Sequence, residues 1–344
     1  PARARLAYDE LLAHQLTLAL ARAKDRRKAG RKTVGDGHLQ QRVLGALPYA
    51  PTGAQTRAIA EIAKDMASGA RMNRLLQGDV GAGKTLVAFM ALLRAVEAGG
   101  QGGLMGPTEI LARQHLEGLR PLAEQAGVVL ELLTGRDKGP ERRAKLSALE
   151  SGAIQILVGT HAVFQADVAF GDLRLAVVDE QHRFGVRQRL ELGKKGQAVD
   201  VLVMTATPIP RSLALAQYGD MDVSVLDEKP PGRKPIRTAL IATDRMEEVV
   251  TRLRAAISEG RQCYWVCPLV EESEVSDLIA AEARFKHLRA ALGEGLVGLV
   301  HGQMPPADKD AAMRAFQQGQ TKLLVATTVI EVGVDVPNAS IIVI

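Results

Sequence analysis

Two short motifs carry residue types that could hold and hydrolyse a nucleoside triphosphate. Residues 78–85 fit the phosphate-loop pattern G-x-x-x-x-G-K-[ST], and they lie between an apolar run and a segment of helical periodicity. Glycines in such a loop let backbone N–H groups turn towards phosphates at the start of a helix. The lysine can reach the β- and γ-phosphates, and the final hydroxyl can bind magnesium. We therefore expect the phosphates to be held by Gly78, Asp79, Gly81, Ala82, Gly83, Lys84 and Thr85.

The second motif is acidic and follows another apolar run, residues 173–178, which is typical of a strand buried on both faces of a parallel sheet. Asp179 could hold magnesium directly or through water, so the predicted metal ligands are Thr85 and Asp179. Glu180 is the candidate general base for the attacking water. Taken alone, each motif could be an ordinary turn. Their occurrence in one chain favours a site that hydrolyses ATP over two ordinary turns.

Length and composition leave room for such an enzyme. A chain of 344 residues is long for one domain, and two α/β domains are the natural division. No apolar run of about eighteen residues predicts a membrane span, and no leader resembles an export signal. Cys263 and Cys267 lie in one apolar strand without a histidine cluster, so we expect reduced, buried thiols in a cytoplasmic protein, not a zinc site.

The charge is modestly basic, with 44 Lys and Arg residues against 39 Asp and Glu residues. Cations gather in residues 22–32, 183–195 and 229–237. Such clusters suit a polyphosphate partner such as DNA, although solvated helix faces would have the same pattern.

The chain divides into four parts by pattern. Residues 1–45 predict a linker helix and a basic connection, and residues 46–228 predict a parallel sheet wrapped by helices. Residues 229–237 are a proline-rich linker, and residues 238–344 form a second α/β unit.

For the second unit, strand and helix patterns continue to alternate. The expected order is a strand at 236–241, a helix at 245–258, a strand through Cys267, and then helix, strand, helix and strand, ending at Val325.

The order of these motifs resembles that of superfamily 2 helicases, and across essentially its whole length the chain resembles the RecG family of branched-DNA helicases. The matching stretches are residues 8–16, 106–112, 159–161, 179–186, 205–211, 267–273, 301–302 and 326–337. The resemblance implies two RecA-like P-loop domains, with ATP and Mg²⁺ as cofactors bridging them. It also implies a bacterial cytoplasmic monomer that moves on branched or duplex DNA and remodels stalled forks and Holliday junctions in recombination and repair.

The resemblance also assigns nucleotide and coupling roles to single residues. Gln55, with Tyr49 before it, is similar to the glutamine that reads adenine, since a side-chain amide both donates and accepts. Gly333 and Asp335 would bring the second domain to the nucleotide. The implied catalytic set is Lys84, Asp179, Glu180, Gln181 and His182.

Further matching residues line the nucleic-acid path in relatives, where polar groups at strand ends can grip phosphates without reading bases. These residues are Pro107, Thr108, Glu109, Thr134, Gly135, Gly159, Thr160, His161, His301, Gly302 and Thr327. Alternatively, these residues only form turns and cap helices.

The chain departs from the family pattern at both ends. It stops within residues 341–344, where we expect a buried strand, and the arginine-rich last motif has no match. Since such arginines contribute on the order of a thousandfold in related systems, we expect this chain alone to hydrolyse ATP weakly. The family's wedge domain would lie before residue 1.

Three hypotheses remain open at this point. The favoured one is an ATP-driven motor that moves on duplex DNA and remodels forks or Holliday junctions. The second is a transcription-repair coupling translocase of the Mfd family, which shares the phosphate loop, residues 183–186 and residues 205–211. The third is a nucleotide-gated clamp that binds DNA without net motion.

Overall fold

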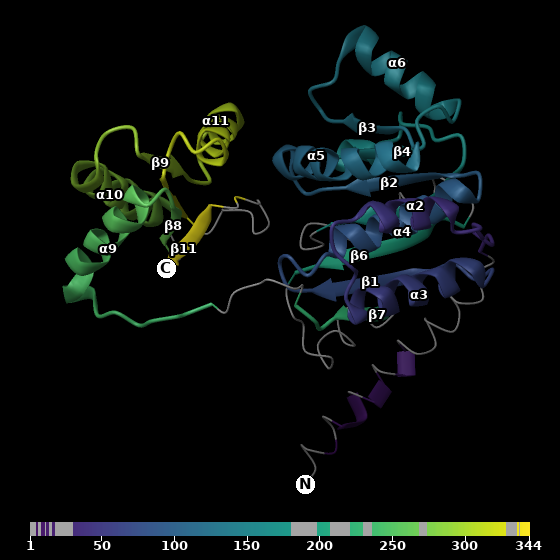
Figure 1. Cartoon of the computed structure of the whole chain (residues 1–344), viewed down its shortest axis with the longest axis horizontal. Helices are drawn as coiled ribbons and strands as arrows, with labels where there is room; N and C mark the ends of the chain where they lie inside the picture. Colours follow the sequence, from purple (N-terminus) through teal and green to yellow (C-terminus); the bar gives the residue numbers. More distant parts are fainter. Residues whose placement is uncertain are drawn as a thin grey trace. The chain divides into compact units, whose positions relative to one another are not determined.

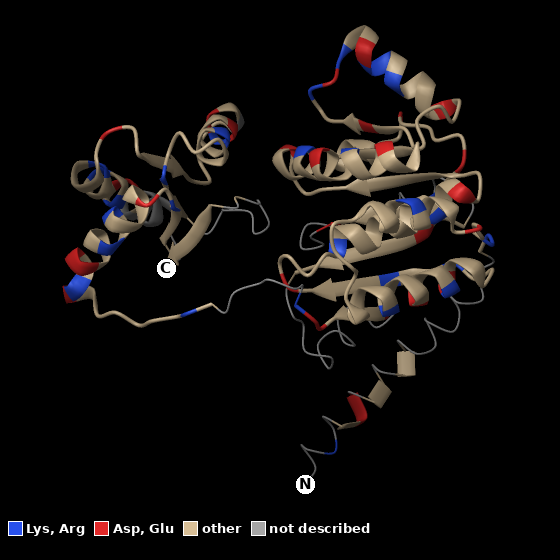
Figure 2. Ribbon diagram, in the orientation of Figure 1, with Lys and Arg blue, Asp and Glu red and all other residues tan. Residues whose placement is uncertain are grey.

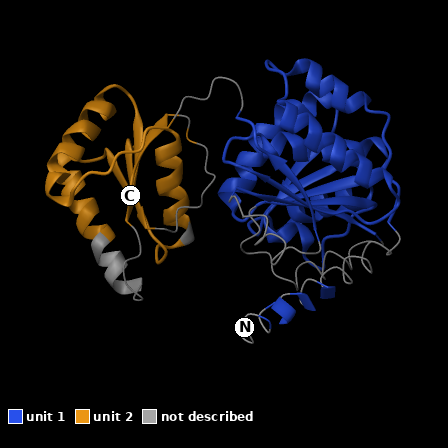
Figure 3. Ribbon diagram, turned by 90° about the horizontal axis from the view of Figure 1, so that it is seen from below, with its two compact units in different colours: residues 1–233 blue, residues 234–344 orange. Residues whose placement is uncertain are grey.

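The computed structural model describes residues 5, 8–10, 12, 13, 16, 17, 30–179, 198–206, 221–229, 236–267, 274–327, 336 and 338–344. The chain separates into two compact units, residues 1–233 and residues 234–344 (Figures 1 and 3). The boundary between the units falls inside the segment 229–237 that the sequence suggests as a linker. The finer division into four parts stays a prediction.

The first unit is built on one parallel sheet. Its described elements are α2 (His38–Ala46), α3 (Gly53–Ala67), β1 (Asn73–Gly78), α4 (Lys84–Glu97), β2 (Gln101–Met105), α5 (Glu109–Ala126), β3 (Leu130–Leu133), α6 (Gly139–Glu150), β4 (Ile156–Gly159), the 3₁₀ turn η1 (His161–Phe164), β5 (Leu173–Val178), β6 (Asp200–Thr205) and β7 (Asp222–Leu226). The strand order is β3-β4-β2-β5-β6-β1-β7, and every pairing in it is parallel.

Apolar side chains cover both faces of this sheet. Leu75 and Leu76 are neighbours on β1 and are both fully buried, yet they belong to different core clusters, because successive strand residues point to opposite faces. One core is shared with α2, α3, α4 and α5, and the other with α6 and η1. The expected strand at residues 173–178 is confirmed, and its apolar run reflects this two-sided burial.

Side-chain caps fix where the site helices begin. Thr52 accepts a bond from the Gln55 N–H (3.2 Å), and the Gln55 side chain accepts one from the Thr52 N–H (2.9 Å), so α3 starts with a capping box. Thr108 caps α5 by accepting from the Leu111 N–H at 3.4 Å. These caps place the starts of two helices at the sheet edge that carries the strand ends.

One expectation for the N-terminal part is wrong. The described residues among the first seventeen are helical, as expected, but the segment before residue 46 is not simply a connection, because it contains α2. Leu39 and Val43 bury that helix against the first core. A helix of 9 residues is too short to be stable alone in water, so this tertiary packing stabilises it.

The second unit has a smaller parallel sheet in the order β11-β8-β10-β9. Its described elements are η3 (Thr243–Arg245), α9 (Met246–Ser258), β8 (Gln262–Cys267), α10 (Glu274–Leu292), β9 (Val297–Val300), α11 (Pro306–Gln317), β10 (Leu323–Thr327) and β11 (Ala339–Val343). The expected alternation from residue 245 to β10 is confirmed.

The expected strand at residues 236–241 is wrong. These residues form no strand, and Ile236 and Leu240 are almost fully exposed. The apolar residues Ile236, Leu240 and Ile241 suggest a strand, but a strand also needs a neighbouring backbone to bond to, and none pairs with this segment in the described chain.

Two smaller expectations for this unit need correction. The apolar residues near position 341 do form a strand, β11, but it lies at the edge of the described sheet with Ile342 exposed rather than buried. Both cysteines are free thiols, as expected, yet only Cys263 is buried and Cys267 is partly exposed. Burial raises the pKa of the Cys263 thiol to about 11, so it stays a neutral thiol at physiological pH.

Charged side chains lie mainly on helices and loops, and the strands are largely free of them (Figure 2). Asp200, at the start of β6, is an exception. It is 1% exposed, and its carboxylate accepts a bond from the Met72 N–H at 2.7 Å. Burial raises its pKa from 3.8 to about 7, against the opposing effects of the Met72 bond and the Arg71 charge.

This carboxyl predicts a measurable pH dependence of stability. Because its pKa is raised on folding, the native state keeps a proton that the unfolded state has released between pH 4 and pH 7, so the contribution of Asp200 to stability falls as pH rises through that window. Above pH 7 the buried charge costs up to about 4 kcal/mol, at roughly 1.4 kcal/mol per pKa unit. Asp200→Asn keeps an acceptor for Met72, so we expect it to be more stable than wild type at pH 8 and to lose that advantage near pH 4. Chemical denaturation at both pH values measures this, and an equal destabilisation at both would contradict it.

Among the described residues, none of the helices is long and apolar enough to cross a membrane.

Candidate nucleotide and nucleic-acid site

The parallel sheet brings the predicted site residues of the first unit to one edge. The carboxyl ends of β1, β2, β3, β4 and β5 lead directly into the phosphate loop, Pro107, Thr134, Thr160 and Asp179, respectively. Along that edge, β3, β4 and β2 carry the predicted nucleic-acid residues, and β1 carries the phosphate loop. Asp179 follows β5, the strand between these two zones. In open α/β sheets, ligands bind outside the carboxyl ends of the strands.

The phosphate loop has the geometry of an anion cradle. Gly81 and Gly83 have φ values of 78° and 85°, the left-handed region that glycine adopts without strain. The helix α4 begins directly at Lys84, and Gly83 provides no side-chain cap for its first N–H groups. The Lys84 ammonium donates to the Gly78 and Asp79 carbonyl oxygens at 2.7 and 3.0 Å and so spans the loop. A positive helix end and an ammonium thus converge at one point.

Gln55 stabilises the conformation of this loop through a hydrogen bond. Its Nε2 donates to the Ala82 carbonyl oxygen at 2.8 Å, and its Oε1 accepts from the Thr52 N–H at 2.9 Å. The side chain is 3% exposed, whereas Tyr49, its predicted companion at the adenine, is about half exposed. Both parts of the amide therefore have a partner within the protein. Its adenine-reading role stays a prediction, and the structure adds a positioning role that the sequence did not suggest.

A cavity of about 210 Å³ lies beside the loop. One wall is made of the loop residues Gly78, Asp79 and Ala82, and the other of residues 225–229 at the end of β7. Sequence reasoning missed this second wall, because only the pairing of β7 with β1 brings residues so far apart in the chain together.

Asp179 is held in a defined orientation. Its backbone N–H donates to the Met105 carbonyl oxygen at 2.8 Å, and its Oδ2 lies 2.7 Å from Nε2 of His115 on α5. Both side chains are nearly buried, at 12% and 10% exposed. His115 belongs to no motif, and only the adjacency of β2 and β5 explains why the helix after β2 reaches Asp179.

The predicted nucleic-acid residues of the first unit have local structural duties as well. The Thr134 hydroxyl donates to Asp137 at 3.1 Å within a turn, and the Glu109 carboxylate pairs with Arg113 and Arg136 at 2.8 and 3.0 Å. At Gly159 a Cβ would lie 2.0 Å from the Leu133 carbonyl oxygen, so close packing requires glycine there. Roles in turns and helix caps thus account for some of these residues. Contact of these residues with nucleic acid stays a prediction. Pro107, Gly135 and Thr160 occupy the same three strand ends, and His161 is exposed beside them.

In the second unit, two predicted residues carry unsatisfied polar atoms. Thr327 ends β10 and His301 follows β9, its neighbour, so the two lie at the same sheet edge. Thr327 Oγ1 and His301 Nδ1 are buried without a hydrogen-bond partner in the described chain. Thr321 Oγ1, before β10 at the opposite end, shares this feature. A buried polar atom without a partner costs about 1–3 kcal/mol, which an oxygen-rich ligand such as a phosphate would relieve. Gly302 lies beside them, and its carbonyl accepts from Lys309 at 2.6 Å.

Several predicted site residues lie outside the described residues. They are Glu180, Gln181, His182, Gly333 and Asp335. The basic cluster 183–195 and most of the cluster 22–32 lie outside as well.

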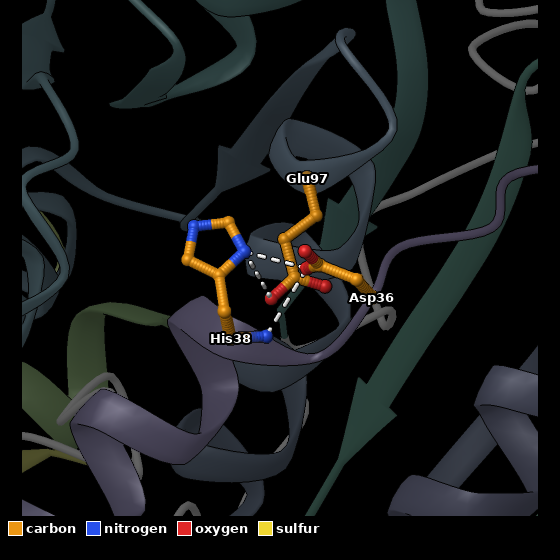
Figure 4. A group of neighbouring side chains, drawn as sticks. All are labelled: Asp36, His38 and Glu97. Carbon is orange, nitrogen blue, oxygen red and sulfur yellow. Dashed lines mark hydrogen bonds and ion pairs between the residues drawn. The ribbon is translucent and has the colours of Figure 1, made fainter.

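Asp36, His38 and Glu97 form a further group of potential metal ligands in the first unit (Figure 4). The Glu97 carboxylate already accepts from the N–H groups of Gly37, Leu39 and Gln40 at 3.1, 2.7 and 3.3 Å. It therefore caps α2 from the end of α4. The positive end of α2 would oppose a cation at this place, so the group is a helix cap rather than a metal site.

Family models match most of the chain. The model described as DEAD/DEAH box helicase matches residues 52–215, and the model described as Helicase conserved C-terminal domain matches residues 244–344. These two matches agree with the two units of the structure.

Curated relatives match the whole chain. The ATP-dependent DNA helicases RecG of Escherichia coli (strain K12) and Bacillus subtilis (strain 168) are 52% and 47% identical over 100% of this chain. The chain spans about half the length of these relatives, 50% and 51%.

A solved structure described as RecG bound to a three-way DNA junction has a TM-score of 0.84 and 43% identity, covering 99% of this chain and 45% of that one. Saccharomyces cerevisiae Dbp5 bound to RNA and ADP BeF₃ has a TM-score of 0.64 at 17% identity, covering 90% of this chain and 78% of that one, and shows the likeness of the fold alone. The expected fold class of two RecA-like domains is confirmed.

Proposed function

Since the chain belongs to the RecG family of ATP-dependent DNA helicases, we propose that it forms the ATP-hydrolysing motor region of a helicase that moves on duplex DNA and remodels branched DNA such as stalled forks and Holliday junctions. The observation that carries this proposal is the shared sheet edge of the first unit, which holds the phosphate loop, Asp179 and the predicted nucleic-acid residues of that unit. A change at the nucleotide can therefore reach the DNA contacts through a single rigid sheet.

The loop residues account for nucleotide binding. The N–H groups at the start of α4 and the Lys84 ammonium would hold the β- and γ-phosphates, in place of the carbonyl oxygens that Lys84 contacts in this structure. The cavity between the loop and residues 225–229 lies next to this phosphate site and would receive the rest of the nucleotide. Gln55 keeps the loop in shape through Ala82.

The residues present fit a magnesium ion. A threonine hydroxyl and a carboxylate are the hard oxygen donors that Mg²⁺ prefers, and Asp179 is already oriented by two bonds. In this proposal Thr85 and Asp179 hold the ion, which neutralises charge on the phosphates when bound. Glu180 accepts a proton from the attacking water.

Contact with DNA is proposed for the strand ends of both units. The buried, unpartnered atoms of Thr327 and His301 support it in the second unit, and Thr108, Thr160 and His161 support it by position in the first. Such contacts grip phosphates, so binding should weaken steeply with salt and depend little on base sequence. A bacterial cytoplasmic location and a monomeric state belong to the same proposal.

Triplex displacement tests the motor directly. The intact protein is mixed with a duplex that carries a fluorescent third strand next to a junction, and release of that strand is followed with ATP or with a non-hydrolysable analogue. We expect release with ATP only. Hydrolysis of ATP without release would overturn the motor and favour the DNA clamp. The relatives at about 50% identity support a branched-DNA helicase over a transcription-coupled translocase.

A further inference from the structure

One contact joins α5, the helix that follows β2, to Asp179, the predicted metal ligand at the end of β5. His115 lies on α5, and its Nε2 is 2.7 Å from Oδ2 of Asp179, which follows β5. A carboxylate can only accept hydrogen bonds, so Nε2 carries the proton and donates it. Since the two side chains are 10% and 12% exposed, water competes little for this bond.

The helix that carries His115 begins at the predicted nucleic-acid residues. Thr108 caps α5, and Glu109, its first residue, is held by Arg113 and Arg136. His115 lies about two turns further along, on the order of 10 Å at 1.5 Å per residue. Leu111, Leu116 and Leu119 are buried, which packs the helix firmly along this length. A displacement of its first turn would therefore be transmitted to His115.

We propose that His115 is a positioning residue, which orients the Asp179 carboxylate for magnesium and links the DNA-contacting start of α5 to that metal ligand. The inference rests on the proposed function, because it takes Asp179 as a ligand of the nucleotide's magnesium ion. Hydrogen-bond partners of metal ligands fix the direction of the ligand's lone pairs, and their loss typically lowers metal affinity by about 10- to 100-fold.

Magnesium-dependent binding of the fluorescent nucleotide mant-ATP tests this role without requiring turnover. The intact protein is titrated with Mg²⁺ at constant mant-ATP, and the half-saturating Mg²⁺ concentration is compared between variants. We expect His115→Asn to raise it by about tenfold or more, because the shorter amide cannot reach Asp179. The amide of His115→Gln can take the place of Nε2, so it should recover most of the wild-type value.

Two controls separate positioning from folding. Glu117→Ala, an exposed change on the same helix, should keep the wild-type midpoint. Binding of mant-ATP in EDTA should be the same in all variants. A His115→Asn protein with a lower melting temperature but an unchanged Mg²⁺ midpoint would overturn the proposal and leave His115 a purely structural role.

The same Mg²⁺ titration in the presence of DNA tests the proposed link between the start of α5 and Asp179. A three-way junction should lower the Mg²⁺ midpoint of the wild type, and His115→Asn should lose most of that shift. An equal shift in both proteins would overturn the link. If the wild type shows no magnesium-dependent mant-ATP binding, the proposed function fails. If it does, and His115→Asn matches it, only the role of His115 fails.

Discussion

Replacing Lys84 with alanine is expected to lower ATP hydrolysis at least about a hundredfold, the loss typical of removing one group that stabilises transition-state charge. The ammonium lies in the phosphate loop, bonded to the Gly78 and Asp79 carbonyl oxygens at 2.7 and 3.0 Å. No other residue of the loop, 78–85, carries a positive charge. Steady-state phosphate release by the intact protein with junction DNA measures the effect.

Lys64→Ala is the matched control for this change. Lys64 is exposed in the last turn of α3, so its removal subtracts the same charge away from the loop. We expect that variant to keep the wild-type rate. A Lys84→Ala protein that is folded and hydrolyses ATP within a fewfold of wild type would contradict the assignment of residues 78–85 as the phosphate site.

Replacing Gly83 with alanine is expected to reduce nucleotide affinity at least about tenfold. The residue has φ 85°, where an L side chain costs roughly 1–2 kcal/mol. In addition, a Cβ would lie 2.3 Å from Nε2 of Gln55. Gln55 would have to move, which breaks its bonds to Ala82 and Thr52 and releases the brace on the loop. Titration with mant-ATP in the presence of Mg²⁺ measures the loss.

Gly99 provides a closely matched comparison. Its φ is 78°, and nothing lies within 4 Å of an added Cβ. Gly99→Ala therefore carries similar backbone strain without the clash, and it should lower the melting temperature while leaving nucleotide affinity unchanged. The double variant Gln55→Ala with Gly83→Ala removes the clash, so its effects should be less than additive. Strictly additive losses would show that Gln55 does not brace the loop.

Strand ends and motifs with a strong local signal could be predicted from the sequence. The glycine-rich turn between a strand and a helix at residues 78–83 and the strand at residues 173–178 were predicted at the positions where the structure has them, because a mostly apolar run that ends at glycine or carboxylate residues allows few other structures. The strand expected at residues 236–241 was wrong for the opposite reason, since pairing depends on a partner that local pattern does not reveal.

The parts of the site that the sequence did not predict depend on the order of the strands in the sheet. His115 reaches Asp179 only because β2 lies beside β5, and residues 225–229 wall the cavity only because β7 lies beside β1. Neither adjacency follows from residue spacing. Gln55 was identified from the resemblance, but its bond to Ala82 depends on the packing of α3 against α4 and was visible only in the structure.

ATP hydrolysis by the intact protein, compared between a three-way or four-way DNA junction, linear duplex and RNA, tests the central claim most directly. Lys84→Ala serves as the blank. The proposed function predicts strong stimulation by the junction, absent in the blank. Equal stimulation by plain duplex would favour a transcription-coupled translocase instead, and stimulation by RNA alone would contradict the assignment of DNA as the polymer.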